Sequence, residues 1–109
     1  MSYNIEGVDC ETNEEGYLLD ANFSDAACLV IAAAEGITLG AEHWEVINYL
    51  REKYQEDGHS PNFRTMLKEL SELNPELDNK KLYELFPVGP AKQGAKIAGL
   101  PQPYGKGGY

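Results

Sequence analysis

The sequence of residues 86–106 is FPVGPAKQGAKIAGLPQPYGK, and it combines the pattern of a short helix with that of an extended tail. Pro90 suits the first turn of a helix, because its fixed φ is helical and an N–H there would lack a partner in any case. Gly99 suits the end of the helix, where a left-handed residue often closes the last turn. We expect this helix to lie very close to a neighbour, because one of its faces holds only small residues. These residues are Ala91, Gly94, Ala95 and Ala98.

The composition changes after Leu100, where the chain continues PQPYGKGGY. Two prolines favour stiff, extended pieces, three glycines favour mobility, and no apolar stripe remains to pack against a core. The sequence therefore predicts a single domain over residues 1–100 and a flexible C-terminal arm over residues 101–109.

Two helices are predicted upstream by apolar spacing and by the residues at their ends. The first begins after Ser24, whose hydroxyl suits an N-cap, and ends near Gly36. The second runs from residue 41 to residue 57, between Gly40 and Gly58. Its apolar stripe consists of Trp44, Ile47, Leu50 and Tyr54.

Two further helices follow in the second half of the chain. Ser60 and Pro61 predict the start of one, as a hydroxyl cap followed by proline at the first helical position, and Pro75 predicts its end. The other fits residues 79–86 and is short. The apolar positions expected to face the core are Phe63, Met66, Leu67, Leu70 and Leu73 in the longer helix and Leu82, Leu85 and Phe86 in the shorter one.

The N-terminal residues 3–19 are predicted to form a small β-hairpin or meander. Apolar residues alternate loosely around a turn at Gly7, and residues 13–16 supply a second turn before a third short strand at residues 17–19. The predicted fold is therefore mainly α, of the α+β class. It has a small β-element, about five helices, a helix-turn-helix-like pair at residues 41–73, and the C-terminal arm.

Charge is spread unevenly along the chain, which has 18 acidic and 9 basic residues and a net charge of −9. Residues 1–57 hold 13 of the acidic residues but only Arg51 and Lys53 as basic ones, whereas five lysines follow residue 79. Overall acidity opposes the phosphate contacts that bind nucleic acids. The lysines near the C-terminal end could meet an acidic protein partner or a local phosphate. The alternative interpretation is that they form a solvated face without a partner.

The sequence shows no catalytic, metal-binding or membrane pattern. His43 and His59 lie 16 residues apart, without further ligands at the spacing that zinc requires. The longest apolar run, residues 26–34, is far shorter than the roughly 20 residues of a membrane span, and the first residues do not resemble an export signal. We therefore expect a cytoplasmic protein that is not an enzyme and holds no cofactor or metal.

Cys10 and Cys28 are 18 residues apart and form no CxxC pair. Two reduced thiols are the expectation in a cytoplasm. Cys28 lies within the apolar run, so we expect it to behave as a small buried hydrophobe. No base near Cys10 in the sequence marks it as an activated thiol.

The two helices on either side of Gly58 resemble a DNA-binding helix-turn-helix. The second helix would carry Arg64 and Lys68, one turn apart, towards a groove. However, residues 41–73 hold seven acidic residues against four basic ones. This excess weighs against DNA binding, which we keep as an alternative.

Residues 86–106 resemble the C-terminal signature of the DsrC/TusE proteins, which are sulfur carriers. The resemblance extends to Glu14–Leu18, Glu42–Trp44 and Leu50-Arg51 and covers nearly the whole chain. It implies a helical fold with a small N-terminal β-element and a mobile arm. It also implies a role as the gamma subunit of a dissimilatory sulfite reductase or in a tRNA-thiolation relay. The matching C-terminal positions are Phe86-Pro87, Gly89–Lys92, Ile97–Pro101, Pro103 and Gly105.

The chain departs from the family pattern at the positions that carry thiols. The cysteine near the end of the family's arm corresponds to Lys106, and the second cysteine, eleven positions earlier, corresponds to Ala95. The family's arginine after that second cysteine is Lys96 here. Sulfur transfer through the arm needs a thiolate at its end, and a lysine ammonium cannot supply that chemistry.

We therefore expect a non-redox DsrC/TusE-like protein that docks on a sulfur-metabolism partner in a regulatory or accessory role. The resemblance implies a sulfite reductase-like complex, a heterodisulfide reductase-like complex or a sulfurtransferase relay as that partner. The residues expected at the docking surface are Lys92, Lys96, Pro101, Pro103, Gly105 and Lys106.

Three alternatives remain open on the sequence. In the first, the chain keeps the ordinary sulfur-relay or gamma-subunit function, in sulfur transfer or tRNA thiolation, with Cys10 or Cys28 as its thiol. In the second, the chain is a DNA-binding regulator that uses Arg64 and Lys68. In the third, Lys106, which is exposed between glycines, is itself acylated or otherwise modified.

Overall fold

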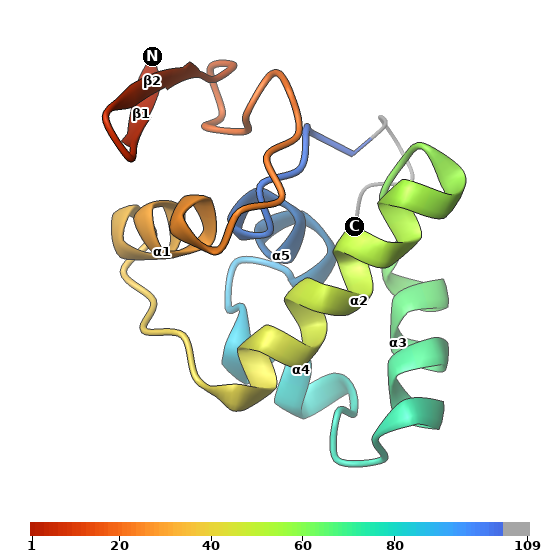
Figure 1. The fold of residues 1–109 in the computed structure, drawn as a ribbon. Coiled ribbons are helices and arrows are strands. Elements are labelled where there is room, and N and C mark those ends of the chain that lie inside the picture. Colours follow the sequence, from red (N-terminus) through yellow and green to blue (C-terminus); the bar gives the residue numbers. More distant parts are fainter. Residues whose placement is uncertain (104–109) are drawn as a thin grey trace.

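The computed structural model describes residues 1–103 and shows, in that part of the chain, a β-hairpin followed by five helices (Figure 1). The elements are β1 (Ser2–Ile5), β2 (Val8–Glu11), α1 (Asp25–Ala34), α2 (Ala41–Asp57), α3 (Phe63–Leu73), α4 (Asn79–Leu85) and α5 (Pro90–Ile97). This order confirms the predicted mainly α class with a small N-terminal β-element. None of the described helices combines the length and the apolarity that crossing a membrane requires.

The hairpin closes through a two-residue turn at Glu6 and Gly7. Both residues have positive φ, 52° and 84°, which suits the right-handed twist of the strands that they connect. β1 and β2 pair antiparallel, with Ser2 opposite Glu11.

The predicted third strand does not form, and this part of the prediction is wrong. A single isolated bridge, between Thr12 and Leu18, stands in its place. The Asn13 side chain accepts hydrogen bonds from the backbone N–H groups of Glu15 and Tyr17, at 3.0 and 3.1 Å. These bonds close the chain into a tight turn, because an asparagine side chain can replace the backbone partners that a strand would supply.

Ser24 caps α1 as predicted, and α2 lies between Gly40 and Gly58 as predicted. The Ser24 hydroxyl accepts a hydrogen bond from the Ala27 N–H at 3.2 Å. At the start of α2, His43 Nδ1 accepts from the Gly40 N–H at 3.0 Å. Gly58 ends α2 in the left-handed conformation, with φ of 78°. His43 is therefore a capping residue of α2.

The start of α3 differs from the prediction. The helix begins at Phe63, and the Asn62 side chain, not Ser60, accepts the capping hydrogen bond, from the Thr65 N–H at 2.9 Å. Ser60 and Pro61 lie buried ahead of the helix. Asparagine caps as well as serine, and it stands at the position from which its carbonyl reaches the third N–H.

The end of α3 also differs, because Leu73 does not face the core. Its side chain is 75% exposed, whereas Leu77 is completely buried. The chain turns after the helix, with the Leu77 N–H donating to the Asn74 carbonyl at 2.9 Å. This turn returns Leu77 to the interior in place of Leu73. The next helix, α4, ends at Leu85, one residue before its predicted end, and Phe86 is buried as expected.

α5 packs against α1, α2, α3 and α4 and lies among them (Figure 1). Its small residues make this possible, since Ala91, Ala95 and Ala98 are at most 1% exposed. A Cβ atom at Gly94 would lie only 3.0 Å from Leu50 Cδ1 of α2. The predicted close approach of this helix is thus confirmed.

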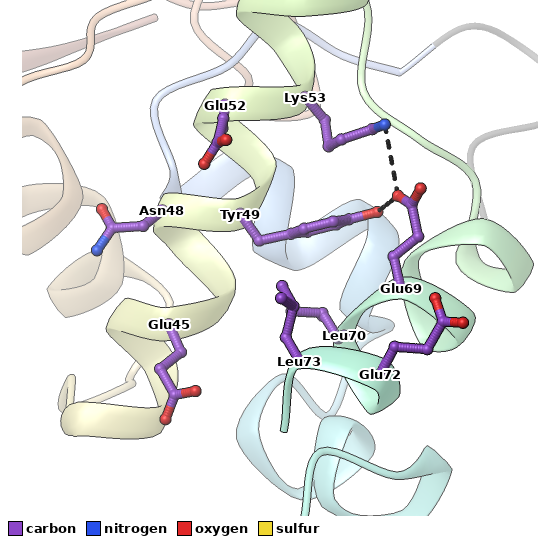
Figure 2. Close-up of a pocket in the computed structure, with 9 residues that line it drawn as sticks. All are labelled: Glu45, Asn48, Tyr49, Glu52, Lys53, Glu69, Leu70, Glu72 and Leu73. Carbon is purple, nitrogen blue, oxygen red and sulfur yellow. Dashed lines mark hydrogen bonds and ion pairs between the residues drawn. The ribbon is translucent and has the colours of Figure 1, made fainter. Parts of the chain in front are cut away.

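α2 and α3 are joined by polar side chains as well as by the core. The Tyr49 hydroxyl donates to Glu69 at 2.5 Å, and Lys53 Nζ lies 3.5 Å from the same carboxylate (Figure 2). The hydrogen bond from Tyr49 lowers the pKa of Glu69, although partial burial opposes it, and the charge of Lys53 lowers it further. The ionised carboxylate is therefore the form that ties the two helices together.

The segment after α5 turns sharply at Gly99, whose φ is 82°. Its carbonyl accepts a hydrogen bond from the Asn22 N–H at 2.8 Å. A Cβ atom at this position would overlap the Asn22 carbonyl oxygen. The backbone of residues 20–24 can therefore reach the end of α5 only if residue 99 is glycine.

We predict that Gly99→Ala lowers the free energy of unfolding by about 3 kcal/mol or more, because it combines a strained φ with a backbone overlap. Gly58→Ala is the matched control: φ is also positive, but open space surrounds its Cβ position, so only about 1 kcal/mol is expected. Urea unfolding followed by circular dichroism measures both. Equal losses in the two variants would contradict the close approach at Gly99.

We also predict that Tyr49→Phe lowers the free energy of unfolding at neutral pH by about 1 kcal/mol, a modest value because Glu69 is partly exposed. The pKa of Glu69 is lowered in the folded protein, so its contribution is complete above the unfolded pKa of 4.5 and disappears as pH falls through the folded value. The difference in stability between Tyr49→Phe and the unsubstituted protein should therefore shrink as the pH falls below 4.5. If the free energies of unfolding of the two proteins differed by the same amount down to about pH 2.5, this account would be contradicted.

Candidate functional site

The candidate site is the place where the chain leaves α5, which we call the arm root and define as residues 99–103. Two backbone hydrogen bonds hold its beginning, from the Gly99 N–H to the Lys96 carbonyl at 3.2 Å and from the Leu100 N–H to the Ala95 carbonyl at 3.1 Å. Leu100 is completely buried. The direction in which the arm departs is therefore set by α5 and by the core.

The arm root also contacts the turn at residues 13–17. Asn13 Nδ2 donates to Gln102 Oε1 at 2.6 Å, and Gln102 Nε2 donates to the Glu15 carboxylate. Pro101 and Pro103, on either side, are half-buried. Residues 101–103 consequently lie against the N-terminal part of the chain, although more than 80 positions separate the two segments. Residues 104–109, with the predicted Gly105 and Lys106, lie outside the described part.

The turn at residues 13–17 is in turn fixed to α5 through Tyr17. The Tyr17 hydroxyl donates to the Lys92 carbonyl at 3.2 Å, and Lys96 Nζ lies 5.1 Å from the centre of the Tyr17 ring. Burial, together with the negative charges of Glu15 and Glu35, raises the pKa of Tyr17 to about 12. Its hydroxyl thus remains protonated and serves as a hydrogen-bond donor.

A polar cluster behind the arm root joins α5 to the end of α1. Lys96 Nζ lies 3.6 Å from Glu35 Oε2, and Gln93 Nε2 donates to Glu35 Oε1 at 3.1 Å. Gln93, which is only 3% exposed, also accepts from the Val88 N–H at 3.1 Å. Every polar group of this cluster that the structure describes is therefore satisfied, and the cation of Lys96 is held in place.

The structure brings together only part of the predicted docking set. Lys92 and Lys96 lie on α5 and Pro101 and Pro103 in the arm root, so these four residues share one region of the molecule. Lys92 is exposed, whereas Lys96 is partly covered by its contacts with Glu35 and Tyr17.

The residues that organise this site were not predicted from the sequence. They are Asn13, Glu15, Glu35, Gln93 and Gln102. The match of residues 14–18 to a family motif was the one available signal, and it marked the turn but not its contact with the arm. Nothing in a single sequence indicates that Gln102 meets Asn13.

The family's thiol positions hold no sulfur. Ala95 is completely buried on α5, and Lys106 lies outside the described residues. Cys28 is also completely buried, with Arg51 Nη2 at 2.8 Å from its Sγ. Burial raises the pKa of Cys28, although the Arg51 charge opposes this effect. Cys28 is thus an unreactive core residue, as predicted, while Cys10 on β2 is half-buried, with its Sγ 3.7 Å from the Val8 carbonyl oxygen.

Arg64 and Lys68 are exposed on α3, one helical turn apart as the sequence predicts. The same helix carries Glu69 and Glu72, so its surface is not continuously basic. Among the described residues, no group of three or more histidine, cysteine, aspartate or glutamate side chains is placed to hold a metal ion.

Comparisons with known proteins agree with this fold. The family described as "DsrC like protein" matches residues 4–106. The protein named sulfurtransferase TusE from Salmonella typhimurium (strain LT2) is 48% identical over 102 residues, which are 91% of this chain and 94% of that protein. The solution structure of Allochromatium vinosum DsrC superposes with a TM-score of 0.86 at 36% identity, over 95% of this chain and 96% of that one.

A second solved structure extends the comparison to sulfite reductase. The crystal structure of the oxidised gamma subunit of the dissimilatory sulfite reductase, DsrC, from Archaeoglobus fulgidus has a TM-score of 0.87 at 31% identity, over 96% of this chain and 98% of that one. The same fold therefore extends over nearly the whole length of all of these proteins.

We predict that Gln102→Ala releases the arm root from the turn at residues 13–17. The backbone order parameter at position 102 should fall to about 0.6 or below, as in flexible segments, and the free energy of unfolding should change by less than about 1 kcal/mol because the lost hydrogen bonds are exposed. Relaxation of ¹⁵N nuclei measures the first, and urea unfolding the second.

Gln55→Ala, at an exposed position of α2, is the matched control and should leave position 102 unchanged. If position 102 were as ordered in Gln102→Ala as in the unsubstituted protein, the Gln102 side chain would not be what holds the arm root.

Proposed function

This chain belongs to the DsrC-like family, and from that premise we propose that it works in sulfur relay or with a dissimilatory sulfite reductase. On this proposal it is a carrier or docking protein of the cytoplasm rather than a classical enzyme. The observation that carries the proposal is the arm root, which α5 and the turn at residues 13–17 hold in a defined direction. The division into a domain of residues 1–100 and an arm of residues 101–109 is part of the same proposal.

The proposed docking surface surrounds the arm root. The partner is a sulfite reductase-like complex, a heterodisulfide reductase-like complex or a sulfurtransferase relay. Positive charge on α5 suits an acidic wall in such a partner, since Lys92 is exposed in the first turn of the helix from which the arm departs. The residues assigned to this surface are Lys92, Lys96, Pro101, Pro103, Gly105 and Lys106.

The names of the relatives favour the ordinary relay function over the regulatory role expected from the sequence. The relatives are named as a sulfurtransferase and as a sulfite reductase subunit, and neither name concerns regulation or DNA. An ordinary relay needs a thiolate that accepts sulfur. Because Cys28 is completely buried, Cys10 is the thiol of the described residues that a donor can reach.

The chemistry at Cys10 would be an exchange of sulfane sulfur. The S–S bond of a donor persulfide breaks, a new S–S bond forms at Cys10 Sγ, and the donor leaves as a thiolate, so electrons and atoms balance.

A second candidate is favoured by the residues at the two thiol positions. Ala95 and Lys106 cannot form a persulfide or a disulfide, yet the segment around them keeps the family pattern. A protein of this kind would bind the same partner without carrying sulfur, in the accessory role that the sequence predicts.

We predict that incubation with a persulfide donor adds about 32 Da, one sulfur atom, to the unsubstituted protein and to Cys28→Ser but not to Cys10→Ser. Intact-protein mass spectrometry measures the adduct, and a thiol-bearing relative such as TusE is the positive control. An adduct on the control alone would contradict the relay function of this chain and leave the accessory role.

A further inference from the structure

A groove of about 580 Å³ runs between α2 and α3 (Figure 2). None of its residues belongs to the arm root or to the turn at residues 13–17, so binding in the groove is independent of the proposed function. The residues that line it are Glu45, Asn48, Tyr49, Glu52, Lys53, Glu69, Leu70, Glu72 and Leu73.

The accessible apolar side chain of the groove is Leu73. Leu73 is 75% exposed, although the helical spacing of α3 would place it in the core. Tyr49 reaches from α2 towards α3, and its ring lies above Leu70 and Leu73 (Figure 2). Tyr49 and Leu70 are themselves buried, at 8% and 1% exposed, so Leu73 supplies nearly all of the apolar area that a partner side chain can cover.

The rim of the groove is acidic. Four glutamates face one lysine, and Lys53 is already engaged by Glu69 at 3.5 Å and by Asp57 at 3.8 Å. Glu45 accepts a hydrogen bond from Asn74 at 3.2 Å. Within residues 1–103, Glu52 and Glu72 have no hydrogen bond or ion pair, and they lie on the two opposite helices. Two unpaired carboxylates thus stand on either side of the exposed leucine.

We propose that this groove binds a basic amphipathic helix of a partner protein. The apolar face of that helix covers Leu73, and its lysine or arginine side chains pair with Glu52 and Glu72. Two helices with an open groove between them are a common receptor for a third helix, and an acidic rim selects a basic occupant.

A second copy of this chain does not fit the groove as well. The lysines that follow residue 79 include Lys81, which pairs with Glu42 and Glu84, and Lys96, which pairs with Glu35. The leucines of α4, Leu82 and Leu85, are buried in the chain's own core, and the half-exposed Tyr83 packs edge-on against the Phe63 ring. In the described residues, α4 therefore exposes no aliphatic side chain beside its lysines.

The test uses a fluorescein-labelled synthetic peptide of about four helical turns, with leucines at helical spacing and lysines between them. A peptide with glutamate in place of every lysine is its matched control. In fluorescence anisotropy at low salt, we expect the full chain to bind the lysine peptide and not the glutamate peptide, with an affinity that falls as salt rises.

Variants of the groove separate its two contributions. Leu73→Ser should weaken binding about tenfold, since the apolar contact is lost. Glu52→Gln with Glu72→Gln should weaken it about fivefold and reduce its salt dependence. Both changes are at exposed positions, and circular dichroism checks that the fold is kept. The control, Glu6→Gln with Glu14→Gln, makes the same change in net charge at exposed positions outside the groove and should leave binding unchanged.

Three outcomes would overturn the proposal. The first is that the chain does not bind the lysine peptide. The second is that the control variant loses as much affinity as the groove variant, which would mean that only net charge attracts the peptide. The third is self-association of the chain in analytical ultracentrifugation that Leu73→Ser abolishes, which would assign the groove to a second copy.

Discussion

The close approach of α5 to its neighbours is the constraint on which the rest of the structure depends. A Cβ atom at Gly94 would lie only 3.0 Å from Leu50 Cδ1, and a Cβ atom at Gly99 would overlap the backbone at Asn22. Larger side chains at either position would push α5 outward, and interiors packed as densely as crystals do not absorb such displacements without cost. The other helices and the turn at residues 13–17 are arranged around α5, the helix with a face of small residues.

The packing of α5 against its neighbours determines the geometry of the arm root. Because α5 is held on several sides, the chain emerges from it at one place and in one direction, against the turn that Tyr17 fixes to the Lys92 carbonyl. Lys96 is held by Glu35 in the same region. A segment that leaves a rigid helix in this way loses less conformational entropy on binding than a free tail, which is what a docking element requires.

The two candidate surfaces of the molecule differ in charge and in construction. α5 carries Lys92 and Lys96 and the arm root carries Pro101 and Pro103, whereas the groove between α2 and α3 has glutamates around an exposed leucine. Opposite charge on separate surfaces favours different partners, because like charges exclude the wrong one at each surface. This arrangement suits a protein that contacts more than one macromolecule.

Local patterns determined most of the secondary structure. Ser24, Gly40 and Gly58 mark helix ends through their own backbone and capping chemistry, and the small face of residues 91–98 predicted close packing, because these properties depend on neighbours within a few positions. Contacts between distant segments decided the rest. The pairing of Gln102 with Asn13 and the exposure of Leu73 depend on where the whole chain brings each side chain, and no spacing along one sequence encodes that.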